Sequence, residues 1–153
     1  MEIKGAEIMS DEKPELVFED LQKGRSFRPL VFPITPELVD EYMETVEDHH
    51  PLYWDQTKAK SLGGPVAPPG LAAVFARLSY LQDNTMPSGG VLAKQEFEFQ
   101  TPAQVGDTLT VEARVFESYV DKKGRKRVNF LITASNQNQK QICLIRLYAI
   151  WPK

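Results

Sequence analysis

The feature that most constrains the fold is a change of hydrophobic period along the chain. From Leu71 to Leu81 nearly every side chain is apolar, with alanines placed among larger residues. A helix that is apolar on almost every side must be buried over most of its surface. From Val91 onward, apolar and polar residues alternate instead, which is typical of strands with one buried face. We therefore expect an α+β domain in which an antiparallel sheet covers one buried helix.

The strand predictions rest on three alternating runs and one run that is apolar on both faces. The alternating runs lie at 97–99, 109–115 and 128–134, with turn-forming residues between them. The last run, 142–151, is apolar on both faces, which predicts a central strand or one covered by a partner. A short strand is expected earlier, within 26–33. Strands that follow one another usually pair, so we expect sequential pairing across the sheet.

Two further helices are predicted before the buried one. Thr35 can cap free backbone amides, and Pro36 fits the first position of a helix. Apolar residues then recur at helical spacing as far as Val46. A short second helix is expected to begin at Asp55 and to end at the glycine pair that starts with Gly63.

The length of 153 residues fits one domain with its own core. We expect residues 1–14, which are polar and lack periodicity, to form a tail, and residues 15–153 to form a single domain. The formal net charge is -3, whereas a protein that binds phosphate backbones usually carries a basic face. Nucleic acid is therefore not an expected partner.

The single cysteine and the amino-terminal segment argue against several classes of protein. Cys143 alternates with apolar neighbours and predicts a small core residue, so neither an internal disulfide nor a cysteine-rich zinc site is expected. No metal site is predicted elsewhere. The chain shows no secretory signal pattern and no apolar run long enough to span a bilayer. We expect a cytoplasmic protein with no membrane partner.

Residues suited to chemistry gather in three segments. Residues 47–55 read Glu-Asp-His-His-Pro-Leu-Tyr-Trp-Asp and hold both histidines of the chain. Residues 64–71 read Gly-Pro-Val-Ala-Pro-Pro-Gly-Leu and lead into the buried helix. Residues 97–109 read Phe-Glu-Phe-Gln-Thr-Pro-Ala-Gln-Val-Gly-Asp-Thr-Leu, which is a strand, a proline, a Gly-Asp turn and the start of another strand.

In this order and spacing, the three segments resemble the MaoC-like hot-dog family, which includes (R)-specific enoyl-CoA hydratases and 3-hydroxyacyl-thioester dehydratases. The resemblance covers residue 18 to the end of the chain. It implies a hot-dog fold, in which a curved antiparallel sheet wraps around one long buried helix. It also implies an acyl thioester of coenzyme A or of a carrier protein as substrate, with no other cofactor. The implied assembly is a homodimer, or a heterodimer with another hot-dog subunit, whose sheets join edge to edge.

The resemblance assigns the catalytic positions to Asp48, His50 and Tyr53. In active family members, an aspartate and a histidine activate the water that adds across the enoyl double bond. Here the aspartate is retained as Asp48, but His50 replaces an asparagine and Tyr53 replaces the histidine. A phenol, with a reference pKa of about 10, is a poor base at neutral pH. His50 with Asp48 is then the remaining base and orienting group. The alternative is that all three side chains only stabilise the loop.

The second segment is implied to bind the substrate at the start of the buried helix. An amide at this position polarises the thioester carbonyl in active members. An ungapped comparison places Pro69 where they carry glycine, and proline has no amide hydrogen to donate; a shift of one residue would place Gly70 there. The expected substrate-binding residues are Val66, Ala67, Pro69, Gly70 and Leu71.

Two functions remain open at this point. The first is a hydratase or dehydratase acting on enoyl or 3-hydroxyacyl thioesters. The second is a non-catalytic subunit that binds the acyl chain and completes the active site of a partner. Family members of this kind often carry Pro-x-Tyr-x-Asp and Ala-Pro-Pro at these two places. This chain carries the same motifs at 51–55 and 67–69. A thioesterase-like activity is less favoured. The basic residues of 122–127 predict a solvated turn or, alternatively, a phosphate or carrier-protein contact.

Overall fold

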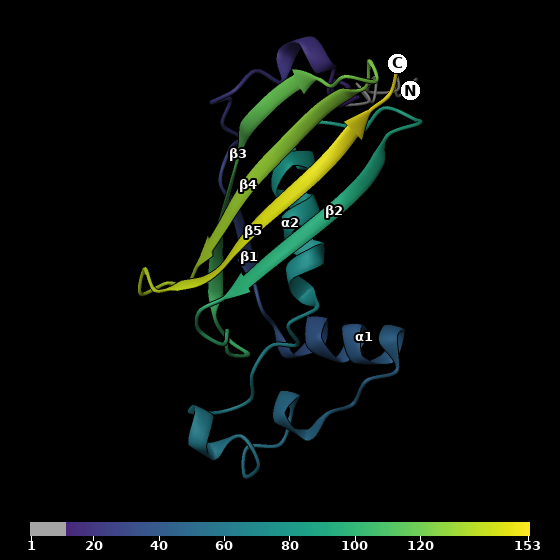
Figure 1. Cartoon of the computed structure of the whole chain (residues 1–153). Coiled ribbons are helices and arrows are strands. Elements are labelled where there is room, and N and C mark those ends of the chain that lie inside the picture. Colours follow the sequence, from purple (N-terminus) through teal and green to yellow (C-terminus); the bar gives the residue numbers. More distant parts are fainter. Residues whose placement is uncertain (1–11) are drawn as a thin grey trace, which may run out of the picture.

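The computed structural model describes residues 12–153 and contains one five-stranded antiparallel sheet with an α-helix beneath it (Figure 1). Eleven of the fourteen residues of the predicted tail lie outside the described residues. The strands are β1 (Leu30–Pro33), β2 (Val91–Phe99), β3 (Thr108–Val120), β4 (Lys126–Ser135) and β5 (Gln141–Trp151). The helices are α1 (Pro36–Val46) and α2 (Leu71–Leu81), with short 3-10 turns at Phe18–Asp20, Pro51–Tyr53 and Lys60–Leu62.

The strand order is β1-β3-β4-β5-β2, so the prediction of sequential pairing is wrong for β2. β3, β4 and β5 do pair in sequence, but β2 lies at the far edge, where Val91 is opposite Ile150 and Phe99 is opposite Cys143. β5 therefore has a neighbour on each side. The prediction of a central strand at 142–151 is confirmed, although only one of its two apolar faces is buried and the other is half-buried.

The prediction of a helix packed beneath the sheet is confirmed, but the expectation that it is buried over most of its surface is wrong, since Val74 and Leu78 are 39% and 41% exposed on its other side. α2 packs against β1 and β3 and buries one side, including Leu71, Ala72 and Phe75, in the core. Tyr80, near the end of α2, stacks its ring on that of Phe130 of β4, with the centroids 4.6 Å apart. The inward-facing residues of β3, β4 and β5 supply much of the remaining core. The sheet curves around this helix, which is the α+β arrangement expected from the sequence (Figure 1).

α1 begins as predicted, but the helix expected after it does not form. The hydroxyl of Thr35 accepts a hydrogen bond from the amide of Leu38 at 3.1 Å, and the helix ends at Glu47 in a left-handed conformation. The region from residue 55 to 63 holds only turns and a short 3-10 segment. The carboxylate of Asp55 caps this segment, accepting from the amides of Thr57 and Lys58 at 2.9 and 3.2 Å. However, only Ala59 within it is buried, and a short helix depends on packing for its stability.

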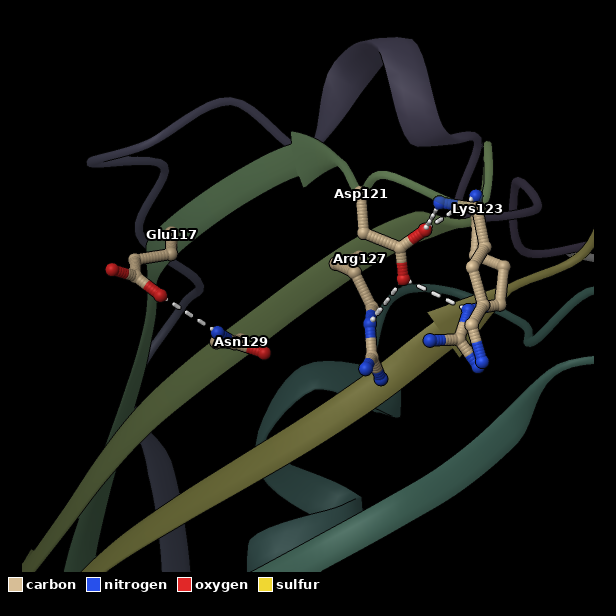
Figure 2. A network of polar contacts seen from close by, with 6 residues as sticks. Glu117, Asp121, Lys123, Arg127 and Asn129 are labelled. Atoms are coloured by element: carbon tan, nitrogen blue, oxygen red, sulfur yellow. Dashed lines mark hydrogen bonds and ion pairs between the residues drawn. The ribbon is translucent and has the colours of Figure 1, made fainter.

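The hairpin between β3 and β4 is organised around Asp121 (Figure 2). Its carboxylate accepts hydrogen bonds from the amides of Lys123 and Arg125 at 2.9 and 3.0 Å. It also accepts from the Nε atoms of Arg125 and Arg127 at 2.8 and 3.1 Å. Two of the basic side chains in this turn are therefore held by an internal carboxylate.

Asp121 is expected to make stability depend on pH in the acid range. Hydrogen bonds from Arg125 and Lys123, with the charge of Arg125, lower the pKa of Asp121 from 3.8 to about 2. A carboxylate with a lowered folded-state pKa stabilises the fold above its unfolded pKa, and this contribution is lost as the pH falls through the folded value. Asp121→Asn should therefore lower the melting temperature at neutral pH. Thermal melts should show the two proteins converging as the pH falls from 3.8 to about 2; a gap that stays constant would contradict this.

Candidate functional site

A cavity of about 420 Å³ lies beside the amino-terminal half of α2. Its closed end is formed by Ile34, Ala72, Phe75 and Ile142, whose exposed fractions are only 1–4%. Its mouth carries the polar side chains of His50, Tyr53, Gln100 and Thr101. The cavity is therefore apolar in its depth and polar where it opens.

Six of the eight predicted site residues line this cavity. They are His50, Tyr53, Val66, Ala67, Pro69 and Leu71. Asp48 and Gly70 are not among its lining residues. Gly70 lies between Pro69 and Leu71 in the chain, and Asp48 is hydrogen-bonded to His50 and Tyr53. Sequence reasoning missed the walls that come from other elements, such as Ile34, Phe99 and Ile142. Their apolar character indicates only burial, so no local signal could have assigned them to the site.

Asp48 links the other two predicted catalytic residues, but not through the imidazole. Its Oδ1 accepts from the backbone amide of His50 at 3.3 Å, and its Oδ2 accepts from the hydroxyl of Tyr53 at 3.5 Å. A carboxylate that accepts from an amide two residues further along stabilises a local turn. Across the described residues, no hydrogen bond joins this carboxylate to the ring of His50.

The ring of His50 is held by its own loop. Its Nδ1 accepts a hydrogen bond from the amide of Leu52 at 3.2 Å. A neutral imidazole has one accepting nitrogen, so its proton lies on Nε2 in this arrangement. The ring therefore has no free lone pair with which to take a proton from water. The neighbouring His49 turns elsewhere, with its Nε2 3.7 Å from Oε1 of Glu44.

Tyr53 is suited to donate a hydrogen bond rather than to accept a proton. Burial raises the pKa of its phenol above 10.0, and the carboxylate of Asp48 raises that pKa further. The phenol therefore keeps its proton at neutral pH. A protonated hydroxyl at the mouth of a cavity can donate to a carbonyl or hydroxyl oxygen of a bound molecule.

The start of α2 offers few free amides. The amides of Leu71, Ala72 and Ala73 donate to the carbonyls of residues 68, 69 and 70 at 3.0–3.1 Å, and residues 68 and 69 are prolines without an amide hydrogen. In this segment, only the amide of Gly70 has no acceptor among the described residues. A Cβ at Gly70 would overlap the hydroxyl of Tyr42, a residue of α1 that sequence reasoning did not assign to the site.

The basic hairpin does not contribute to this site. It lies at the end of the sheet away from α1 and the start of α2 (Figure 1). Arg125 and Arg127 bind Asp121, and Lys126 reaches Glu19 with an Nζ–Oε1 distance of 3.5 Å. Its position and internal ion pairs favour the solvated turn over a contact to a thioester bound in the cavity.

The comparisons with known proteins agree with this architecture. Residues 21–144 match the family described as FAS1-like, dehydratase domain region. A curated relative, a UPF0336 protein of Saccharopolyspora erythraea, is 30% identical over 101 residues, which is 60% of this chain and only 65% of the relative's length. No helix within residues 12–153 is long and apolar enough to cross a membrane.

Several solved structures share the fold at low sequence identity. The (R)-hydratase of A. caviae involved in PHA biosynthesis has a TM-score of 0.73 and 20% identity, covering 88% of this chain and 99% of its own. A MaoC-like dehydratase of Rhodospirillum rubrum has a TM-score of 0.75 and 20% identity, covering 90% and 98%. The HadBC complex of Mycobacterium tuberculosis, described as a 3R-hydroxyacyl-ACP dehydratase, has a TM-score of 0.71 and 21% identity, covering 84% and 96%.

Proposed function

The chain belongs to the family of FAS1-like dehydratase domain regions and has the MaoC-like hot-dog fold, and from this premise we propose that it binds an acyl thioester without supplying the catalytic base. The acyl tail would occupy the cavity beside α2. Coenzyme A or a carrier protein would present the thioester at the mouth. The base that activates water would come from a second hot-dog subunit.

The lining of the cavity supports an acyl tail as the ligand. The closed end is apolar and almost fully buried, with Ile34 on one side and Phe75 on another. Burying a methylene group in such surroundings contributes about 0.8 kcal/mol. To hold the thioester, Tyr53 would turn its single hydroxyl proton from Asp48 to the thioester oxygen. Tail burial with a few polar groups at the opening is the usual pattern of a small-molecule site.

The state of His50 carries the proposal that the base is absent. Its only accepting nitrogen already receives the amide of Leu52. Tyr53 keeps its proton at neutral pH because its pKa is raised, and Asp48 is bonded to both neighbours. A general base needs a free acceptor within reach of the water that it activates. Neither His50 nor Tyr53 offers one in this arrangement, and Asp48, whose oxygens keep free lone pairs, is not among the residues that line the cavity.

A self-sufficient hydratase or dehydratase is the second candidate. The observation that favours it is the position of His50 and Tyr53 at the mouth, with Asp48 beside them. In this version, His50 releases the amide of Leu52 and turns Nδ1 toward the water, and Asp48 orients the ring. The oxyanion donor would be the amide of Gly70.

Heteromeric relatives support a partner that supplies the base. The HadBC and ChsH1-ChsH2 structures from Mycobacterium tuberculosis are each described as complexes, and both share this fold. In such an assembly, the present chain would contribute tail binding, and the other chain would contribute the chemistry. If the two chains divided these roles, the residues at positions 50 and 53 would not need to transfer protons.

The proposal is tested by measuring binding and turnover separately on the purified chain. Titration calorimetry with decanoyl-CoA should show binding, because the tail fills the cavity. Loss of enoyl absorbance with crotonyl-CoA and decenoyl-CoA should show no hydration. Asp48→Asn should bind decanoyl-CoA as the wild type does, because Asp48 does not line the cavity.

Two results would decide against the proposal. Robust hydration by the chain alone, abolished by both Asp48→Asn and His50→Ala, would establish the self-sufficient enzyme instead. Failure to bind decanoyl-CoA and its carrier-protein equivalent would remove the acyl ligand altogether. Hydration that appears only after a second hot-dog chain is added would support the divided site.

A further inference from the structure

The glycine at position 70 is explained by a neighbouring side chain and not by its own backbone. Its φ and ψ of -63° and -18° are helical values that any residue adopts. A Cβ at this position, however, would overlap the hydroxyl oxygen of Tyr42 and lie 3.0 Å from its Cζ. The phenol of Tyr42, on α1, therefore packs directly on the backbone at the start of α2, where the two helices approach each other (Figure 1).

The hydroxyl of Tyr42 is free to bind a further group. Among residues 12–153 it has no hydrogen-bond partner. No buried side-chain oxygen in this part of the chain lacks a partner, so the hydroxyl oxygen of the partly buried Tyr42 is open to solvent. The hydroxyl of Tyr53, in contrast, already donates to Asp48 at 3.5 Å. Tyr42 is therefore the phenol that can donate without first giving up another hydrogen bond.

This hydroxyl lies at the border of the cavity, near its polar mouth. Tyr42 does not line the cavity, but Pro69 and Leu71, on either side of Gly70, do. Burial and the carboxylate of Asp48 raise the pKa of Tyr53, and the nearby Tyr42 raises it further. The two phenols, one from α1 and one from the loop after it, thus lie close together beside the start of α2.

We propose that Tyr42 is a substrate-binding residue whose hydroxyl donates a hydrogen bond to the carbonyl oxygen of the thioester. The inference rests on the proposed function, because it requires the acyl tail to fill the cavity and the thioester to remain at the mouth. A polar thioester held there lies beyond the apolar lining. That is where the free hydroxyl of Tyr42 is found.

The start of α2 has a need for such a donor. Pro68 and Pro69 have no amide hydrogen, and the amide of Gly70 is the one in this segment without an acceptor among the described residues. A hydroxyl from α1 would supply a hydrogen bond that the two prolines cannot. A carbonyl oxygen has two lone pairs, so it can accept from Tyr42 and from a second donor, such as Tyr53, at the same time.

The inference is tested by Tyr42→Phe with two ligands that differ at the thioester carbonyl. Decanoyl-CoA carries this carbonyl, whereas S-decyl-CoA is a thioether with a tail of the same length and no oxygen there. Tyr42→Phe keeps the ring that packs on Gly70 and removes only the hydroxyl. Calorimetry should show about two- to tenfold weaker binding of decanoyl-CoA, the effect of one neutral hydrogen bond, and unchanged binding of S-decyl-CoA.

Gly70→Ala tests the same contact from the other side. Its methyl group would displace the hydroxyl of Tyr42 and leave the backbone amide in place, so it should also weaken decanoyl-CoA more than S-decyl-CoA. Added to Tyr42→Phe, it should cause little further loss of this preference, because the hydroxyl is already absent. Tyr148→Phe is the control. It removes a phenol hydroxyl that donates to Glu96 at 3.2 Å and does not line the cavity, so both affinities should be unchanged.

The failure of this inference can be distinguished from the failure of the proposed function. If Tyr42→Phe weakened both ligands equally, or weakened neither, Tyr42 would only pack against Gly70 and the inference alone would be overturned. If the wild type did not bind decanoyl-CoA, the proposed function would fall and the inference with it. Thermal melts followed by circular dichroism check that each variant is folded at the temperature of the titration.

Discussion

Replacing Phe130 with alanine is expected to lower the free energy of unfolding by about 3–5 kcal/mol. The ring of Phe130 is 1% exposed, stacks on Tyr80, and has Phe27 and Trp151 at 6.1 Å centroid distance. Its removal would leave a cavity among three aromatic neighbours that cannot all close in. Domains of this kind have a total stability of about 5–15 kcal/mol, so this single change should remove a large share of the stability. Urea unfolding followed by tryptophan fluorescence measures the change.

Tyr119→Ala serves as the matched control, because the residue is aromatic and lies on the neighbouring strand β3. It is 45% exposed and is not part of the buried core. Its loss should change the free energy of unfolding by only about 0.5 kcal/mol. Equal costs for the two substitutions would show that the cluster around Phe130 is not the centre of stability.

Ala72→Leu is expected to weaken the binding of a long acyl thioester strongly. Ala72 is 2% exposed and lies in the closed end of the cavity, where leucine would add three carbons. If these displace roughly three methylenes of the tail, at about 0.8 kcal/mol each, the loss of about 2.4 kcal/mol corresponds to roughly 50-fold weaker binding. Calorimetry with decanoyl-CoA should show this loss. Butyryl-CoA, whose tail is short, should be affected much less.

Ala73→Leu is the natural comparison for that experiment. It makes the same chemical change one residue further along α2, but Ala73 is exposed and does not line the cavity. Decanoyl-CoA should bind to this variant as it does to wild type. If both substitutions weakened the binding of decanoyl-CoA equally, the tail would lie elsewhere. If both variants bound decanoyl-CoA as tightly as wild type, the cavity would not hold the tail.

The elements that could be predicted from the sequence are those defined by their own composition. α2 is apolar on most sides, and α1 begins with a capping threonine and a proline, so both helices follow from local chemistry. The position of β2 in the sheet does not follow from local chemistry. The alternation of its residues indicates which face is buried but not which strand it pairs with. The helix expected after Asp55 does not form because only Ala59 of this segment is buried, and a short helix without a packed apolar face is marginal even when its first turn is capped.

The location of the candidate site could be predicted from the sequence, but the hydrogen bonding of its polar side chains could not. Resemblance brought six residues to the cavity, including His50 and Tyr53. The walls contributed by Ile34 and Phe99 come from elements distant in the sequence and required the fold. The lone pair on Nδ1 of His50 accepts a hydrogen bond from the amide of Leu52 because of the path of the loop backbone. This path cannot be predicted from the sequence.

The place of β5 inside the sheet has a consequence during synthesis on the ribosome. β2 emerges from the ribosome before β3, β4 and β5, yet its only neighbour is β5. Until that strand is made, the growing chain displays both a bare strand and the apolar residues of α2, the kind of surface that favours misassembly. Such a nascent chain is a natural client for a chaperone. Neighbouring ribosomes on one message would also bring such unpaired strands close together.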